Sequence, residues 1–361
     1  MDRSRLPFAC ADNHAMPRSI AFALAAAALF GASTPLAKSL GAGLSPFLTA
    51  GLLYLGSGLG LALARLVRDR GWKPAGLAAR EWPWLLGAIL FGGVLGPLGL
   101  MAGLRTASAA TASLLLNLEA VLTAAIAWLV FRENADRRVV LGMAAIVAGG
   151  AVLAWADVGT SAWGWAGSAG VALACLCWAI DNNLTRKVSA SDALFIAACK
   201  GLVAGSVNTA LALGQGVPWP TGSLVLTTMA VGLLGYGVSL VLFVLALRGL
   251  GTARTGAYFS TAPFLGALVA IVFWGEPTTG AFWLAAALMG LGVVLHVSER
   301  HEHEHAHEPL EHTHPHSHDA HHQHSHGFAW DGAEPHVHPH HHGYVRHSHP
   351  HYPDIHHQHR H

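Results

Sequence analysis

Ten long apolar stretches, separated by short polar loops, run from about residue 19 to residue 297. They cover about 19–39, 44–65, 82–102, 106–130, 138–156, 164–186, 192–213, 223–247, 251–274 and 278–297. A helix needs about 20 apolar residues to cross the hydrocarbon core of a bilayer, and most of these stretches have that length. The pattern therefore predicts ten transmembrane helices, with glycine and proline marking several of the loops between them.

The composition agrees with an integral membrane protein. Of the 361 residues, 53% are hydrophobic and 11% are charged, whereas soluble proteins carry about 25% charged residues. The net charge of +1 gives no indication of nucleic-acid binding. The four cysteines have no framework spacing, and three lie in apolar stretches, so we interpret them as buried thiols.

The first apolar stretch has two interpretations. Arg18 followed by residues 20–30 has the basic and apolar regions of a signal peptide. However, the apolar character continues to about Leu40, and the segment has a similar partner later in the chain. We therefore expect a spanning helix here.

The chain repeats itself at a fixed distance. Residues 105–133 align with residues 248–276, which pairs Arg105 with Arg248 and Glu133 with Glu276 at an offset of 143. Residues 30–38 align in the same way with 178–186, so that Lys38 stands over Arg186 at an offset of 148. Each repeat contains five spans, and an odd number forces the second repeat to be inverted relative to the first, as in many secondary transporters.

The positive charges indicate the orientation and the domains. With a cytoplasmic N-terminus, eighteen basic residues lie on the inside, and the outer loops hold two, Lys38 and Arg105. Both termini are then cytoplasmic, and we expect the cell (inner) membrane as the location. The predicted parts are a cytoplasmic segment 1–18, a first repeat 19–156, a second repeat 164–297 and a polar tail 298–361.

These features resemble the drug/metabolite transporter superfamily, specifically its EamA-type ten-helix members, over residues 19–297. The marks are Gly/Ser-rich first and sixth spans that end in a base, and fourth and ninth spans that close on an acid. Pro263 with Glu276 matches the usual spacing of the ninth span, whereas Ala120 replaces the usual proline of the fourth span, directly after Glu119. The resemblance implies secondary transport of amino acids or other small metabolites, often as export, across the inner membrane.

Glu119, near the middle of the fourth span, is the first candidate for a working residue. A carboxylate at this depth costs about 2.5–3.5 kcal/mol on insertion scales, so it is rarely incidental. It either binds a proton or a cationic group, or it pairs within the bundle and locks two helices together. Thr123 lies one turn further along the same helical face.

A second group of polar residues follows in the later spans. Asp181 and Asn182 lie toward the cytoplasmic end of the sixth span, where Cys177 and Asp181 share a face as an incomplete ligand pair for a soft metal. A helix end wetted by the cytoplasm is the alternative interpretation of this group. Lys200 in the seventh span requires a partner, either Asp181 or Glu119. Three further residues are candidates to line a cavity for an anionic or zwitterionic substrate, although Tyr258 could simply pack and Arg254 could extend to the membrane surface: Tyr236, Arg254 and Tyr258.

The tail holds 24 of the 26 histidines, and its composition predicts disorder. Neutral imidazole is a ligand for Zn, Ni, Co and Cu, so we expect redundant, non-specific metal binding that buffers or senses metal. A pH-dependent polycation and a neutral solubilising tail are the alternatives. The candidate ligands lie in His-x-His runs: His301, His303, His305, His307, His312, His314, His316, His318, His336, His338 and His340.

Three functions remain open on the sequence alone. The first is a secondary transporter of a small metabolite, amino acid or drug-like solute with a separate metal-binding tail. The second is a transporter of a divalent transition metal whose tail collects or senses the cargo, and the third is a membrane-anchored metal buffer. No nucleophile–base arrangement, phosphate loop or fixed-spacing metalloenzyme motif is present, so we predict no enzyme and no required cofactor. The expected partners are the lipid bilayer and a small-molecule or ion substrate.

Overall fold

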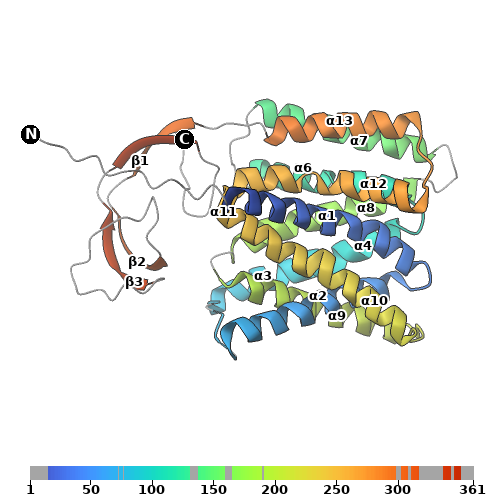
Figure 1. Ribbon diagram of the computed structural model, residues 1–361, viewed down its shortest axis with the longest axis horizontal. Helices are drawn as coiled ribbons and strands as arrows, with labels where there is room; N and C mark the ends of the chain where they lie inside the picture. Colours follow the sequence, from blue (N-terminus) through green and yellow to red (C-terminus); the bar gives the residue numbers. More distant parts are fainter. Residues whose placement is uncertain are drawn as a thin grey trace, which may run out of the picture. The chain divides into compact units, whose positions relative to one another are not determined.

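The computed structural model describes residues 15–71, 73–75, 77–130, 137–158, 165–188 and 191–297, and in the tail 302–307, 310–316, 336–342 and 345–350. The chain divides into two units, residues 1–299 and 300–361. The first unit is a bundle of helices that lie side by side (Figure 1). Its first half contains α1 (Ala15–Gly41), α2 (Pro46–Asp69), η1 (Ala79–Glu81), α3 (Trp82–Ala88), η2 (Ile89–Leu95), α4 (Gly96–Gly103), α5 (Ala109–Leu115), α6 (Leu118–Leu129) and α7 (Arg137–Val158). Its second half contains α8 (Trp165–Arg186), α9 (Ala193–Gly214), α10 (Gly222–Gly232), η3 (Leu233–Val238), α11 (Ser239–Phe259), α12 (Ala262–Trp274) and α13 (Gly280–Val297).

The helices account for the ten predicted spans. Among the described residues, seven helical stretches are long and apolar enough to cross a membrane, and the first of them, Arg18–Gly41, is the stretch that also resembled a signal peptide. Two shorter apolar helices, Ala262–Trp274 and Gly280–Leu295, cover the ninth and tenth spans. The sixth span is α8, whose 22 residues include Asp181 and Arg186. The prediction of an all-helical membrane fold is thus confirmed.

The packing of the helices follows the sequence repeat. The second span, α2, packs on the seventh, α9, and the fifth, α7, packs on the tenth, α13. The first span packs on the eighth and ninth, and the sixth span packs in the same way on the third and fourth. When the two repeats exchange places, the α2–α9 and α7–α13 contacts map onto themselves, and the contacts of the first span map onto those of the sixth, as the predicted two-repeat architecture requires.

Individual glycines show the same exchange. A Cβ atom on Gly149 of α7 would lie 2.9 Å from the carbonyl oxygen of Ala285 on α13. A Cβ atom on Gly292 of α13 would lie 2.6 Å from the carbonyl oxygen of Gly142 on α7. The two contacts are related by the offset of 143 residues. In lipid, such close backbone approach through small residues supplies much of the attraction between helices.

The two repeats also share their irregularities. The third span contains a π-helical segment at Ile89–Leu95, and the eighth contains one at Leu233–Val238, 144 residues later. The fourth span is broken between α5 and α6, and the ninth is broken between α11 and α12. Because π-helical turns are rare and often mark functional positions, their recurrence at equivalent places directs attention to the helices around them.

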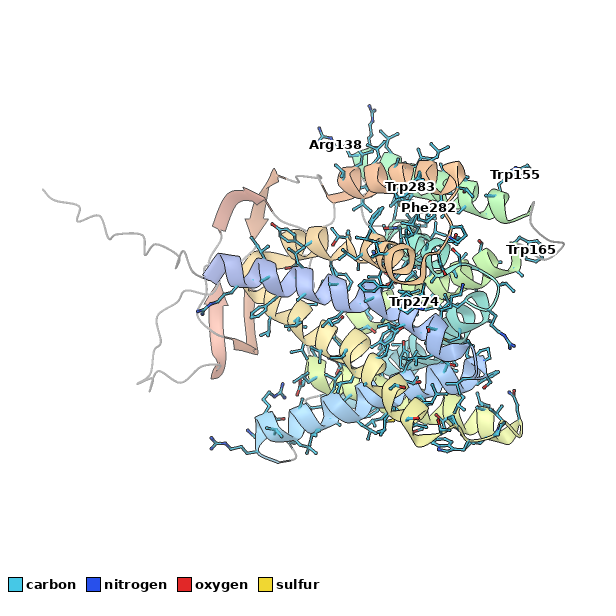
Figure 2. All side chains as sticks on the ribbon, turned by 45° about the vertical axis from the view of Figure 1, so that its right-hand side comes forward. Arg138, Trp155, Trp165, Trp274, Phe282 and Trp283 are labelled. Carbon is cyan, nitrogen blue, oxygen red and sulfur yellow. The ribbon has the colours of Figure 1, made fainter. Side chains whose placement is uncertain are left out.

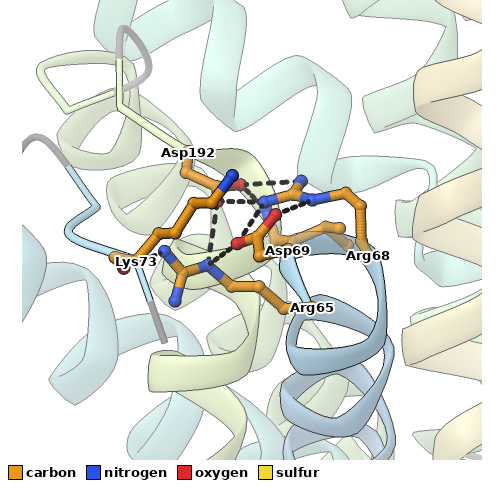
Figure 3. Close-up of polar contacts among 6 residues, drawn as sticks. Arg65, Arg68, Asp69, Lys73 and Asp192 are labelled. Carbon is orange, nitrogen blue, oxygen red and sulfur yellow. Dashed lines mark hydrogen bonds and ion pairs between the residues drawn. The ribbon is translucent and has the colours of Figure 1, made fainter. Parts of the chain in front are cut away.

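One end of the bundle is held by a cluster of four charged residues, shown in Figure 3. The Nε atom of Arg65 and the Nη2 atom of Arg68, both on α2, lie 2.9 Å and 2.5 Å from a carboxylate oxygen of Asp192. Asp192 also accepts a hydrogen bond from the amide of Leu194 and so caps the first turn of α9. Arg68 and Asp69 form a further pair, with 2.7 Å between Nε and Oδ1. The end of α2 is thereby tied to the start of its repeat counterpart, α9.

Exposed tryptophans mark the ends of two other helices, α7 and α8. Trp155 at the end of α7 is 82% exposed, and Trp165 at the start of α8 is exposed as well. Figure 2 shows Arg138 and Trp155 toward opposite ends of α7, with Trp165 near the Trp155 end. Tryptophan gathers at membrane–water interfaces, where its ring is half in lipid, and the arrangement agrees with helices that cross a bilayer.

The structure describes four short segments of the tail unit, and they form two strand pairs. β1 (Glu302–His307) pairs with β4 (Val345–Pro350), and β2 (Leu310–His316) pairs with β3 (His336–His342), both antiparallel. Successive side chains of a strand point to opposite faces of the sheet, so a His-x-His pattern places its histidines on the same face. An isolated two-stranded pair is marginally stable at best, so these pairs do not make a core. The side chains of the eleven candidate histidines lie outside the described residues.

Candidate functional site

The break in the fourth span determines where Glu119 lies. The hydroxyl of Ser108 caps α5 by accepting a hydrogen bond from the amide of Thr111 at 2.9 Å. After Leu115 the chain makes a turn, and α6 begins again at Leu118. Glu119 therefore stands in the first turn of α6, directly after the break, and its amide donates to the carbonyl oxygen of Leu116 at 3.1 Å.

Glu119 is bound by a neutral amide from the sixth span. The Nδ2 atom of Asn182 donates to Oε1 of Glu119 at 2.9 Å and to Oγ1 of Thr123 at 3.3 Å. Glu119 and Thr123 are partly exposed and Asn182 is exposed. Glu119 and Thr123 thus lie on the same helical face, as predicted, and Asn182 contacts both of them. Among the described residues, no basic side chain lies within ion-pair distance of Glu119.

Asp181, the residue before Asn182, has a charged partner instead. The Nζ atom of Lys200 on α9 lies 2.6 Å from both carboxylate oxygens of Asp181. The hydroxyl of Thr185 donates to Oδ1 of Asp181 at 2.8 Å, and the Asp181 residue is buried. Of the two partners that the sequence left open for Lys200, the structure selects Asp181. It also places this carboxylate inside the bundle and not at a wetted helix end.

The π-helical segment of the third span connects this ion pair to the second span. The carbonyl oxygen of Gly92 accepts hydrogen bonds from Tyr54 Oη at 2.8 Å and from Trp178 Nε1 at 3.0 Å. A Cβ atom on Gly92 would overlap Oδ2 of Asp181, so only glycine allows the carboxylate this position. Sequence reasoning missed Tyr54, Gly92 and Trp178. The two adjacent glycines of the third span, Gly92 and Gly93, were the available signal.

An aromatic row continues from Tyr54 across the bundle. The ring of Tyr54 lies 5.6 Å from that of Tyr236 in η3, and Tyr236 lies 6.0 Å from Phe30 on α1. Phe30 in turn lies 5.4 Å from Phe259 at the end of α11. The candidate Tyr236 thus belongs to a continuous aromatic row that ends at Phe259, the residue after the candidate Tyr258.

The eight residues predicted for the substrate or proton pathway lie in different parts of the bundle. Five of them form two adjoining polar groups between the fourth, sixth and seventh spans, and Tyr236 lies in the aromatic row next to Tyr54. Tyr258 is partly exposed in α11, and the side chain of Arg254 lies outside the described residues. Within the described part of the chain, no group of three or more His, Cys, Asp and Glu residues could hold a metal ion. Asp181 is engaged by Lys200, so the ligand pair with Cys177 that the sequence suggested is not assembled.

A family model described as the EamA-like transporter family matches residues 17–155 and again residues 165–298. The chain belongs to the EamA-like transporter family. It is a multi-pass membrane transporter, as the resemblance of its fourth, ninth, first and sixth spans indicated. The two matches coincide closely with the two five-helix repeats.

Two relatives of this EamA-like transporter agree with that assignment. An "Uncharacterized transporter" of Methanothermobacter thermautotrophicus is 26% identical over 287 residues, which cover 75% of this chain and 84% of the relative. A solved structure titled "Crystal structure of protein" superimposes with a TM-score of 0.57 and 22% identity, covering 77% of this chain and 94% of the other. At that identity the structural likeness shows the fold alone.

Proposed function

We propose that this EamA-like transporter is a secondary carrier that exports a small metabolite, amino acid or drug-like solute. Glu119 is its coupling residue, and its carboxylate alternately binds and releases a proton or a cationic group during transport. The observation that carries the proposal is the contrast between the two acids of the bundle. Asp181 is neutralised by Lys200 at 2.6 Å, whereas within the described part of the chain the side chain of Glu119 is bound by the neutral amide of Asn182 at 2.9 Å and by no base.

The surroundings of Glu119 support a binding role. Asn182 donates in both of its hydrogen bonds, so among the described residues Oε2 of Glu119 and the side-chain oxygen of Asn182 remain available as acceptors. A carboxylate left without a base in a membrane is costly unless a cation reaches it. Helices broken near the middle of a span are the usual place for substrate and ion sites in inverted-repeat transporters.

The test replaces Glu119 by glutamine in the full chain, reconstituted into vesicles with a pH gradient. Glu119→Gln keeps a hydrogen-bond acceptor for Asn182 but holds neither a proton nor a cationic group. We expect loss of gradient-driven flux with normal insertion. Glu81→Gln, at a partly exposed acid of η1, serves as the matched control. Undiminished flux in Glu119→Gln would reduce Glu119 to a residue that locks two helices together.

The location and orientation belong to the same proposal. We place the carrier in the cell (inner) membrane with both termini cytoplasmic, on the basis of eighteen inner and two outer basic residues. Single cysteines introduced near residue 43 and near residue 74, in a background without the native cysteines, test this. A membrane-impermeant maleimide added to intact cells should label position 43 and spare position 74, and the reverse pattern would contradict the orientation.

The histidines of the tail favour a second role, metal binding, because 24 of them lie after residue 300. As a separate module, the tail would buffer or sense Zn, Ni, Co or Cu at its His-x-His runs.

Transport of the metal itself and a pure membrane-anchored buffer are the competing roles. The spans hold one histidine, His296, so a metal path would depend on Glu119 and thiols. Deleting 301–361 and comparing growth and cell metal content in graded metal separates these roles, and an unchanged tolerance would exclude all of them.

A further inference from the structure

A cavity lies beside the end of α1, away from Glu119. Its volume is about 330 Å³, and it opens between the ends of α1 and α4 and the start of α2. Its apolar walls include Leu44, Met101 and Leu104, and two basic side chains, Lys38 and Arg105, line it as well. By the charge count, these two are the basic residues of the outer loops. The two basic residues that the charge count places on the outside thus line the same cavity.

Lys38 is held in place without being fully neutralised. Its Nζ atom donates to the carbonyl oxygen of Ala107 at 2.7 Å and lies 3.5 Å from Oε1 of Glu276. Glu276 is already engaged, because its two oxygens accept hydrogen bonds from the amides of Ala109 at 2.9 Å and Ala110 at 2.8 Å. An ammonium group has three donors, so one N–H of Lys38 remains for a further acceptor.

Arg105 adds a second positive group with its donors unused. Arg105 is exposed, and its side chain forms no hydrogen bond or ion pair with the other described residues. A guanidinium presents a planar fork that matches the two oxygens of a carboxylate. One fork and one free ammonium donor, with apolar walls around them, form a recognition surface for an organic anion.

The sequence contains this basic pair twice. Lys38 aligns with Arg186, and Arg105 aligns with Arg248, one in each repeat. Because the repeats are inverted, the second pair belongs at the opposite face of the membrane. The side chains of Arg186 and Arg248 lie outside the described residues, so this point rests on the sequence alone. A carrier that handles the same acidic group on both sides would need such a duplicated pair.

We infer that the cavity bounded by Lys38 and Arg105 is a binding site for the carboxylate of a small organic solute. The inference depends on the proposed carrier function only for its role as an outer subsite of the transport path. Binding itself can be measured without transport. The carboxylate accepts from Arg105 and from the free N–H of Lys38, while its apolar part lies against Leu44, Met101 and Leu104.

The experiment uses the full chain in detergent micelles and ligand-observed NMR with benzoate and its neutral counterpart, benzamide. We expect benzoate to bind, benzamide to bind at least about tenfold more weakly, and salt to weaken benzoate binding. Arg105→Met should weaken benzoate binding by about tenfold without disturbing the Lys38 contacts, and Lys38→Met/Arg105→Met should abolish it. Arg138→Met, at an exposed arginine on α7, is the matched control and should bind benzoate as the wild type does.

Three results would overturn the inference. They are equal binding of benzoate and benzamide, unchanged benzoate binding in Arg105→Met, and displacement of benzoate by equimolar sulfate, which would indicate a general anion site. Vesicle flux separates the two proposals. If benzoate binds through Arg105 but Glu119→Gln transports normally, the carboxylate site stands and the coupling role of Glu119 fails.

Discussion

Gly58 on α2 and Gly201 on α9 touch each other although they are 143 residues apart, which is the offset of the sequence repeat. A Cβ atom on Gly201 would lie 2.6 Å from the Cα atom of Gly58, and one on Gly58 would overlap the amide nitrogen of Leu202. The two glycines are thus repeat equivalents in direct contact. They mark the place where the pseudo-twofold relationship of the two halves passes through the bundle.

Gly58→Ala should therefore weaken the α2–α9 contact. No side chain can move aside, because the added methyl group meets backbone atoms, and overpacking of this kind costs about 1–3 kcal/mol. Unfolding of the purified protein in detergent measures the loss. Gly214→Ala, at the end of α9 with nothing within 4 Å of the added atom, should stay within about 0.5 kcal/mol of wild type. Equal effects of the two substitutions would contradict the contact.

The Asp181–Lys200 pair should behave as a buried ion pair. Asp181→Asn or Lys200→Met alone leaves one charge unpaired inside the bundle and should cost about 3–5 kcal/mol. The double variant removes both charges, so it should be more stable than the worse single variant. A double-mutant cycle of unfolding free energies gives the coupling. Additive losses would mean that the two side chains do not interact in the membrane.

Asp192 should make stability depend on acid pH. Burial alone would raise its pKa, but the hydrogen bonds from Arg68 and then from Arg65 outweigh this effect and lower the pKa from 3.8 to about 2. Because the folded pKa is the lower one, the stabilisation is complete above about pH 4 and is lost as the pH falls toward about 2. Asp192→Asn should thus be less stable than wild type at pH 7 and should approach it near pH 2.5.

The control for this pH profile is Glu81→Gln in η1. Glu81 is partly exposed and forms no ion pair among the described residues, and its carboxylate accepts a hydrogen bond from the amide of Ala78. Glutamine keeps an acceptor oxygen for that amide, so the unfolding midpoint of this variant should follow that of wild type from pH 7 to pH 2.5. If the Asp192→Asn difference persists unchanged at pH 2.5, the ion cluster of Figure 3 is not its source.

Glu276 should slow hydrogen exchange of the backbone amides at the start of α5. Its carboxylate accepts from the amides of Ala109 and Ala110, and Glu276→Ala leaves both buried amides without this acceptor, at about 1–3 kcal/mol. Hydrogen exchange at residues 109 and 110 should become faster. Glu276→Gln retains one acceptor oxygen, so its exchange should lie between the two. Exchange at the first turn of α9, which Asp192 caps, serves as the internal reference and should not change.

The number of spans, the repeat and the family follow from the order of the amino acids alone. These features are local, because a spanning helix satisfies its own backbone hydrogen bonds and needs only length and apolar side chains. The same reasoning selected Glu119, Asp181, Asn182 and Lys200, since polar groups at that depth are costly wherever they point. It could not choose between Asp181 and Glu119 as the partner of Lys200.

That choice depends on how the helices pack together in the folded protein. The hydrogen bonds of Tyr54 and Trp178 to Gly92 and the cap that Glu276 places on α5 depend on the same packing. Each of these contacts joins helices that are far apart in the chain. It depends on how each helix is rotated about its axis, and in the third span on a π-helical turn that shifts the rotation. The apolar pattern carries little information on that rotation in lipid, because outward and inward faces are both apolar. The pairing of the charges, and with it the isolation of Glu119, therefore follows from packing.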